Sequence, residues 1–359
     1  SGIRCCGASP NSRQRPTELD YPEREPDQLE GVPLPEFQTG VSGHEAARAT
    51  LLDRLDAGRL PGGVLIHGPR GIGKATLAFD LARRIFEKTG DESPGHIAAQ
   101  VAAGAYPNLF VMRKSARDTG KGYYTAIRVE EVRRFIEEMR MTRGRAGHRI
   151  AIVDPIDDCN ASSANALLKI LEEPPADTTF LLVSHRPGSL LPTIKSRCFQ
   201  VALRPIADGD VRTVLEQVGG QPLAIDRAVA LAGGRPRRGF EAMLLGEGGA
   251  LQLLQAWLAD PVGAPSAARI ALADALGADR DSAELRFARD ILNDWLAEAA
   301  KAAASAGSRV RLASANELWD KARLSLADAD EYNLDMRQTL VALFDAIRKH
   351  QLLSVQPTP

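Results

Sequence analysis

The 359-residue sequence has little cysteine, few aromatic residues and almost no net charge. Its scattered cysteines favour neither a disulfide framework nor a CxxC metal knuckle, and they suit a reducing, cytoplasmic setting. They are Cys5, Cys6, Cys159 and Cys198. The 45 Lys and Arg residues are balanced by 46 Asp and Glu residues, which argues against DNA binding by bulk electrostatic attraction. No apolar run reaches the ~18 residues of a membrane span, and we expect no signal peptide.

Composition and hydrophobic periodicity divide the chain into four stretches. Residues 1–31 are rich in proline and polar residues, and we expect a disordered leader. Residues 32–204 alternate short apolar runs with helical patterns, which predicts an α/β domain with a mostly parallel sheet. Beyond it we expect a small helical domain over residues 205–245 and a helical packing or assembly domain over residues 246–359.

The elements expected in the α/β stretch follow from the spacing of its apolar residues. Four short apolar runs have the length of buried strands, namely Gly63–His67, Leu109–Met112, His148–Val153 and Thr179–Val183. Apolar residues recur at helical spacing in Ala46–Ala57, Ala75–Glu87 and from Val129 to Met139. Alternation of strand and helix is typical of parallel strands joined by crossover helices.

The strongest chemical signal is a glycine-rich loop between the first predicted strand and the helix after it. The segment Gly68–Lys74 has the spacing of a phosphate-binding P-loop, whose backbone N–H groups and lysine face phosphate oxygens. The motif then requires Ser or Thr to ligate Mg²⁺, but the sequence has Ala75. Thr76 comes one position late, about 100° further around the helix. The residues assigned to this degenerate phosphate site are Gly68, Gly71, Gly73, Lys74 and Thr76.

A second apolar run ends in a carboxylate. Asp154 follows His148–Val153, which is the Walker B arrangement in which the aspartate helps to hold Mg²⁺. Active ATPases of this type place a glutamate next, to activate the attacking water, whereas this sequence has Pro155. Asp157 and Asp158 lie beyond a turn. Because the hydroxyl ligand and the catalytic base are both missing, the sequence predicts an ATPase fold without efficient ATP hydrolysis.

A third feature is the run Ser196-Arg197-Cys198. An arginine supplied in trans to a neighbouring site can act as an arginine finger, because its guanidinium stabilises charge on the transferring phosphoryl group. From position alone, a surface arginine in a loop is the favoured interpretation of Arg197.

Three segments together resemble the clamp-loader branch of the AAA+ proteins. Asn165–Pro175 is similar to the family's NALLKxLEEPP helix, Phe180–His185 to its sensor 1 strand, and Leu191–Cys198 to its LPTIxSRC element. The resemblance covers roughly residues 33–245 by motif. It implies an AAA+ P-loop NTPase-like parallel sheet domain, a small helical lid and an all-α collar domain.

Within that family, the combination points to a subunit that keeps the Ser-Arg-Cys element while both ATPase motifs are degenerate. The resemblance implies an ATPase-deficient accessory subunit of DNA polymerase III, which supplies Arg197, beside Ser196, to the ATP of a neighbouring gamma/tau subunit. The implied partners are gamma/tau and delta in a hetero-pentamer, with the sliding clamp and primed DNA reached through the assembly. Two alternatives stay open: an active, gamma/tau-like AAA+ subunit and a purely structural scaffold.

The resemblance assigns further positions more weakly. Sensor 1 is Ser184 or His185, and the sequence does not choose between them. Gly233–Arg237 resembles the sensor 2 element and puts Arg237 in the sensor position, with a plain surface arginine as an equal alternative.

No cofactor is expected to be required. Because the glycine cradle, Lys74, Asp154 and Arg237 are kept, we expect weak or absent binding of ATP, ADP or phosphate without turnover. Many clamp-loader subunits carry a four-cysteine zinc module before the second strand, but residues 87–108 contain no cysteine, and we predict no zinc.

Overall fold

The structure is a computed structural model that describes residues 28–118, 122–141, 145–246 and 249–355. The predicted leader lies almost wholly outside these ranges. The chain forms two compact units, one ending at Phe240 and the other beginning at Glu241.

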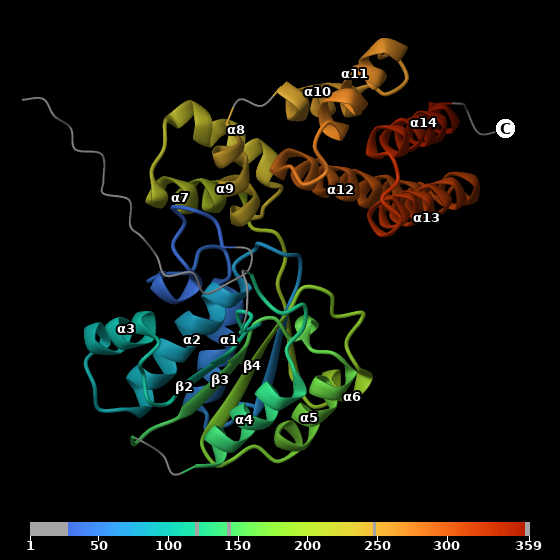
Figure 1. Cartoon of the computed structure of the whole chain (residues 1–359). Helices are drawn as coiled ribbons and strands as arrows, with labels where there is room; N and C mark the ends of the chain where they lie inside the picture. The colour runs from blue at the N-terminus through green and yellow to red at the C-terminus, as the bar shows by residue number, and fades with distance from the viewer. Residues whose placement is uncertain (1–27, 119–121, 142–144, 247–248, 356–359) are drawn as a thin grey trace, which may run out of the picture. The chain divides into compact units, whose positions relative to one another are not determined.

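The first unit is built around a parallel sheet of five strands (Figure 1). The strands are β1 (Gly63–His67), β2 (Leu109–Met112), β3 (Arg149–Val153), β4 (Thr178–Ser184) and β5 (Phe199–Ala202). Their order is β2-β3-β4-β1-β5, and every neighbouring pair is parallel. This arrangement confirms the predicted α/β fold class and adds β5, an edge strand that the hydrophobic pattern did not reveal.

Helices cover both faces of the sheet because successive strand residues point in opposite directions. Val64 and Ile66 of β1 pack against one set of helices, while Leu65 packs against the other. The first set is α1 (Glu45–Asp56), α2 (Lys74–Thr89) and α3 (Pro94–Ala103). The second set is α4 (Val129–Arg140) and α5 (Ala161–Glu172). The sheet is therefore the middle layer of three and holds the phosphate-loop end of β1 in a fixed place.

Short helical turns join the strands to the rest of the unit. They are η1 (Pro35–Phe37), η2 (Ile156–Asp158) and α6 (Pro192–Lys195). Beyond β5 come α7 (Asp208–Val218), α8 (Pro222–Ala232) and α9 (Pro236–Leu245), and α7 packs against α8. Gly234 lies close to the backbone of Ile206, whose N–H donates to the Gly234 carbonyl at 2.9 Å, so the helical segment is fastened to the end of the sheet.

In the described residues of the second unit, the regular elements are all helices. Its helices are α10 (Gly249–Ala259), α11 (Ser266–Gly277), α12 (Ala283–Ser305), α13 (Arg309–Glu331) and α14 (Met336–Val355). Trp257 and Phe344 are buried in its core, with ring centroids 4.9 Å apart. Among the described helices, none combines the length and apolar character needed to cross a membrane.

Candidate nucleotide site and arginine element

The loop between β1 and α2 has the backbone that its glycines allow. Gly71 and Gly73 have φ values of 81° and 96°, which L-residues rarely adopt. A side chain at Gly68 would collide with the Leu203 carbonyl after β5. Helix α2 begins at Lys74, so its N-terminal N–H groups lie at the end of the loop, as a phosphate site requires.

Lys74 is turned into its own loop. Its Nζ donates to the carbonyl oxygens of Gly68 at 2.8 Å and Pro69 at 2.6 Å, and the residue is 3% exposed. Burial lowers the pKa of Lys74 to about 8, although the nearby carboxylates Asp154 and Asp157 oppose that shift. The loop carbonyls therefore take the hydrogen bonds that this ammonium group would offer to phosphate.

Two further residues hold the loop from outside. The Arg237 N–H donates to the Gly71 carbonyl at 3.2 Å, and a Cβ added at Gly71 would lie 2.7 Å from Arg237 Cβ. The His44 ring places Nε2 at 2.6 Å from the Ile72 carbonyl, which makes this nitrogen the donor. The structure thus brings the sensor 2 residue predicted from sequence onto the phosphate loop, through its backbone.

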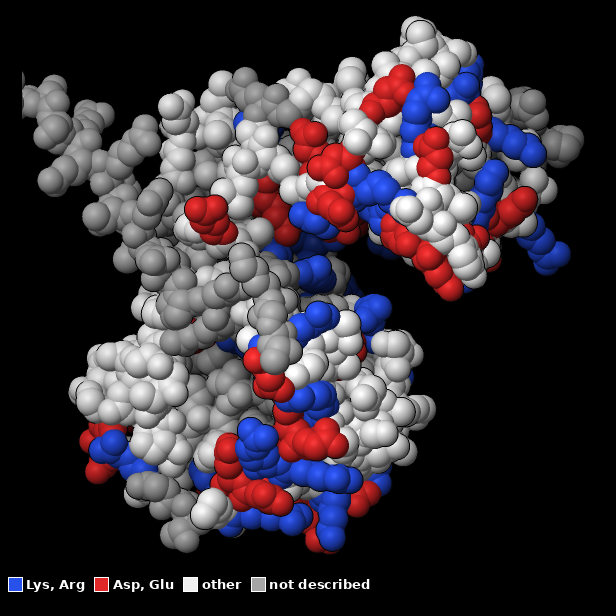
Figure 2. Space-filling model, in the orientation of Figure 1, with Lys and Arg blue, Asp and Glu red and all other residues white. Residues whose placement is uncertain are grey.

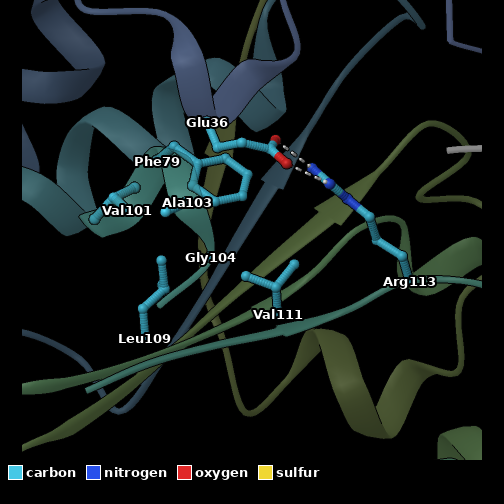
Figure 3. Close-up of a pocket in the computed structure, with 8 residues that line it drawn as sticks. All are labelled: Glu36, Phe79, Val101, Ala103, Gly104, Leu109, Val111 and Arg113. Atoms are coloured by element: carbon cyan, nitrogen blue, oxygen red, sulfur yellow. Dashed lines mark hydrogen bonds and ion pairs between the residues drawn. The ribbon is translucent and has the colours of Figure 1, made fainter. Parts of the chain in front are cut away.

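Asp154 directly follows β3 and lies beside a cation that sequence reasoning missed. Its Oδ2 lies 3.4 Å from Arg113 Nη2, and Arg113 also pairs with Glu36 through two contacts of 3.1 Å. Burial raises the pKa of Asp154, with Arg113 opposing that shift. Figure 3 shows Glu36 and Arg113 pointing toward each other at one end of a cavity of about 400 Å³. The only sequence signal for this contact is a basic residue directly after a strand.

The Asp157 carboxylate is hydrogen-bonded to residues at the end of β4. It accepts hydrogen bonds from the Ser184 hydroxyl at 3.0 Å and from the N–H groups of His185 at 2.5 Å and Arg186 at 3.2 Å. This carboxylate therefore holds a strand end and is not poised to activate water. Burial, followed by repulsion from Lys74, lowers the pKa of His185 to about 3, so its ring is neutral at pH 7.

These residues do not fit the Mg²⁺ ion that an active P-loop ATPase holds. Ala75 offers no hydroxyl, Pro155 offers no carboxylate, and Asp154 already contacts a guanidinium. Thr76 lies within the first turn of α2, one position beyond the required place. The site retains a phosphate cradle but lacks the usual set of metal ligands.

The Arg197 side chain is 31% exposed, and its guanidinium contacts residues of its own chain. Its Nη1 donates to the Thr193 carbonyl at 2.9 Å, and its Nη2 pairs with Glu172 at the end of α5. The Ser196 hydroxyl also donates to the Thr193 carbonyl, at 3.2 Å. The neighbouring Cys198 packs against the sheet, and burial raises its thiol pKa to about 11.

The arginine element lies at the opposite end of β1 from the phosphate loop. A Cβ added at Gly63, the first residue of β1, would be 3.5 Å from the Arg197 carbonyl, whereas Gly68 follows the last residue of the strand. Five residues of extended strand span about 16 Å. Arg197 therefore lies at the end of the sheet remote from the phosphate loop of its own chain.

The pKa of Lys74 predicts a rise in stability at alkaline pH. The ordinary pKa of a lysine is 10.5, whereas the pKa of Lys74 in the folded chain is about 8. Between these values the unfolded chain binds more protons, so the free energy of unfolding should rise with pH. Urea unfolding from pH 7.5 to 10.5 measures the slope, and Lys74→Met should remove this contribution. An unchanged slope in the variant would contradict the assignment.

The sequence comparisons concern the unit that carries this site. Residues 43–207 match the family model described as DNA polymerase III, delta subunit. The match covers slightly less than half of the chain and shows what this part of it is similar to. The match confirms the resemblance drawn from Asn165–Pro175 and Leu191–Cys198.

Individual curated proteins show the same similarity. DNA polymerase III subunit delta' of Pseudomonas aeruginosa is 35% identical over 178 residues, which are 48% of this chain and 52% of the relative. The Yersinia pestis delta' subunit is 32% identical over 199 residues, covering 52% of this chain and 56% of the relative. DNA polymerase III subunit tau of Escherichia coli is 29% identical over 188 residues, 51% of this chain and 28% of the relative. The chain spans about half the length of the delta' relatives that it matches.

Proposed function

We propose that this chain is the delta-prime subunit of a bacterial replicative clamp loader, in which it supplies Arg197 in trans to the ATP of a neighbouring gamma/tau subunit. The observation that carries the proposal is the position of Arg197. It lies at the end of β1 remote from the chain's own phosphate loop, and its side chain is 31% exposed. A guanidinium so placed can reach a nucleotide only on another subunit.

The chain's own site supports a role without ATP hydrolysis. Ala75 and Pro155 stand where a metal-ligating hydroxyl and a catalytic carboxylate are needed. Asp157, the nearest remaining carboxylate, is held by three donors at the end of β4. A phosphate loop fastened by Lys74 and Arg237 suits a subunit that keeps one shape during the reaction cycle. Any ATP, ADP or phosphate binding would accordingly be weak and without turnover.

The partners follow from the family. Identity extends to both delta' and tau proteins of DNA polymerase III, which supports a place in a clamp-loader assembly, and the assembly proposed is a hetero-pentamer with gamma/tau and delta. The sliding clamp and primed DNA would be engaged by the assembly, and we place this role in the cytoplasm. Figure 2 shows Lys and Arg interspersed with Asp and Glu on the visible face, which suits a chain whose main contacts are with proteins.

One observation favours the alternative of a purely structural scaffold. The guanidinium of Arg197 is already paired with Glu172. For Arg197 to reach a phosphate on another chain, its ion pair with Glu172 must break. Exposed ion pairs contribute only about 0–1 kcal/mol to stability. The contact therefore does not bar Arg197 from a phosphate on another chain.

The proposal is tested by ATP hydrolysis with the purified chain. Alone with Mg-ATP, the chain should show no turnover. Added to gamma/tau and delta with the clamp and primed DNA, it should raise the ATPase rate of the mixture. Turnover by the isolated chain that disappears in Lys74→Ala would instead identify an active, gamma/tau-like ATPase.

A further inference from the structure

The guanidinium of Arg113 lies between two buried carboxylates. Nη1 lies 3.1 Å from Glu36 Oε1, and Nη2 lies 3.1 Å from Glu36 Oε2. Nη2 also lies 3.4 Å from Asp154 Oδ2. The side chains of Arg113, Glu36 and Asp154 are 10%, 3% and 9% exposed. One nitrogen thus bridges an acid of η1 and the acid that ends β3, although these residues are 118 positions apart in the sequence.

A buried carboxylate needs a compensating cation or a proton, because burial disfavours its charged form. In P-loop ATPases, the carboxylate at the end of this strand receives its cation from solution, as Mg²⁺. Here the cation is part of the chain. Two parallel hydrogen bonds to Glu36 fix the plane of the guanidinium, a geometry that arginine forms and lysine cannot.

The segment that carries Glu36 is itself fastened to α2. Arg83 donates from Nη1 to the Glu36 carbonyl at 3.2 Å and from Nη2 to the Gln38 carbonyl. Leu34 beside it is buried. Arg113 also lies over the ring of Phe79 in α2, 5.4 Å from its centroid. The pairing with Asp154 therefore ties a short N-terminal strap, residues 34–38, to the end of the central sheet.

We propose that Arg113, oriented by Glu36, is the resident cation of the Asp154 position: it takes the place of the divalent metal and turns Asp154 from a metal ligand into an anchor for this strap. The inference deepens the proposed loss of Mg-ATP chemistry and does not depend on the role of Arg197. It also explains how an acid of the Walker B position stays useful in a chain that has lost its hydroxyl ligand.

The proposal predicts that divalent metal stabilises the Arg113→Met variant but not the wild-type protein. In the wild-type protein, Arg113 already pairs with both Glu36 and Asp154, so these two carboxylates are not open to Mg²⁺ or Mn²⁺. Without the guanidinium, Glu36 and Asp154 face each other as two buried acids, which take up a proton or a divalent cation. Arg113→Met should therefore create a metal dependence that the natural protein lacks.

The test is urea unfolding of the full chain with and without millimolar Mn²⁺. Wild type should unfold at the same urea concentration in both. Arg113→Met should lower the folding equilibrium constant by roughly 10²–10⁴-fold, because one partner of a buried pair is removed, and Mn²⁺ should restore part of that loss. The matched control is Lys114→Met, which removes the adjacent, more exposed pair with Asp158 and should cost less than about fivefold.

Two results would overturn the inference: stabilisation of the wild type by Mn²⁺ that is lost in Asp154→Asn, or an Arg113→Met variant as stable and as indifferent to metal as Lys114→Met. If Arg113→Met does not fold, Arg113→Lys keeps a charge without the two-pronged geometry and should lose stability without gaining a metal response. The ATPase assay of the assembly reads Arg197 separately, so a failure of this inference is distinguishable from a failure of the proposed function.

Discussion

In the proposed assembly, replacing Arg197 with alanine should slow ATP hydrolysis by about 10³–10⁵-fold at the neighbouring gamma/tau site. A finger in trans stabilises charge that develops on the transferring phosphoryl group, so its loss affects the chemical step and leaves ATP binding largely unchanged. Arg197 is partly exposed and lies outside the hydrophobic core, which means that the variant should fold and assemble normally. Pre-steady-state hydrolysis by the reconstituted assembly would show the loss of one fast site.

Two matched variants separate the finger from general effects of charge. Lys195→Ala removes a neighbouring cation from α6 and should leave the rate unchanged. Arg197→Lys keeps the charge without the planar fork and should recover little of the activity. A normal rate in Arg197→Ala, with assembly intact by size-exclusion chromatography, would favour the structural scaffold.

Gly234→Ala should destabilise the first unit by about 2–4 kcal/mol. Gly234 has a φ of 70°, and a Cβ there would lie 2.6 Å from the Ile206 carbonyl oxygen and 2.6 Å from Pro205 Cβ. The left-handed backbone costs an L-residue about 1–2 kcal/mol, and the collision with backbone adds a packing penalty of similar size. The contact joins the turn after α8 to the segment that follows β5, so urea unfolding of the full chain would report the loss.

Gly209→Ala provides the control for this substitution. Gly209 lies in α7, has ordinary helical backbone and has open space around the added Cβ. Alanine there should raise stability by about 0.5–1 kcal/mol, because glycine is the poorer helix former. If Gly234→Ala lowered the free energy of unfolding no more than Gly209→Ala does, the proposed role of Gly234 in holding the helical segment would be wrong.

Central elements of the first unit were predictable because their signals are local. β1, β3 and β4 are buried on both faces and appear as continuous apolar runs, and the glycines of the phosphate loop mark the turn after β1. Edge strand β5 was missed because it alternates exposed and buried residues over only four positions. Helix α3 was also missed, since only Ile97 and Val101 are buried in it.

The candidate site was predictable only where chemistry follows chain order. Asp154 ends an apolar strand and Lys74 follows a glycine loop, so both could be read from the sequence. The pairing of Arg113 with Glu36 joins residues 77 positions apart, and no spacing rule links them. The capture of Asp157 by the end of β4 is likewise a contact across the fold, which turns an apparent spare carboxylate into a structural acceptor.

The most direct test of this role for Arg197 is the structure of the reconstituted assembly trapped with a γ-phosphate transition-state mimic. We predict that the Arg197 guanidinium leaves Glu172 and lies within about 2.7–3.0 Å of the mimic bound to the neighbouring gamma/tau subunit. Arg197 still paired with Glu172, and out of reach of any nucleotide, would contradict it.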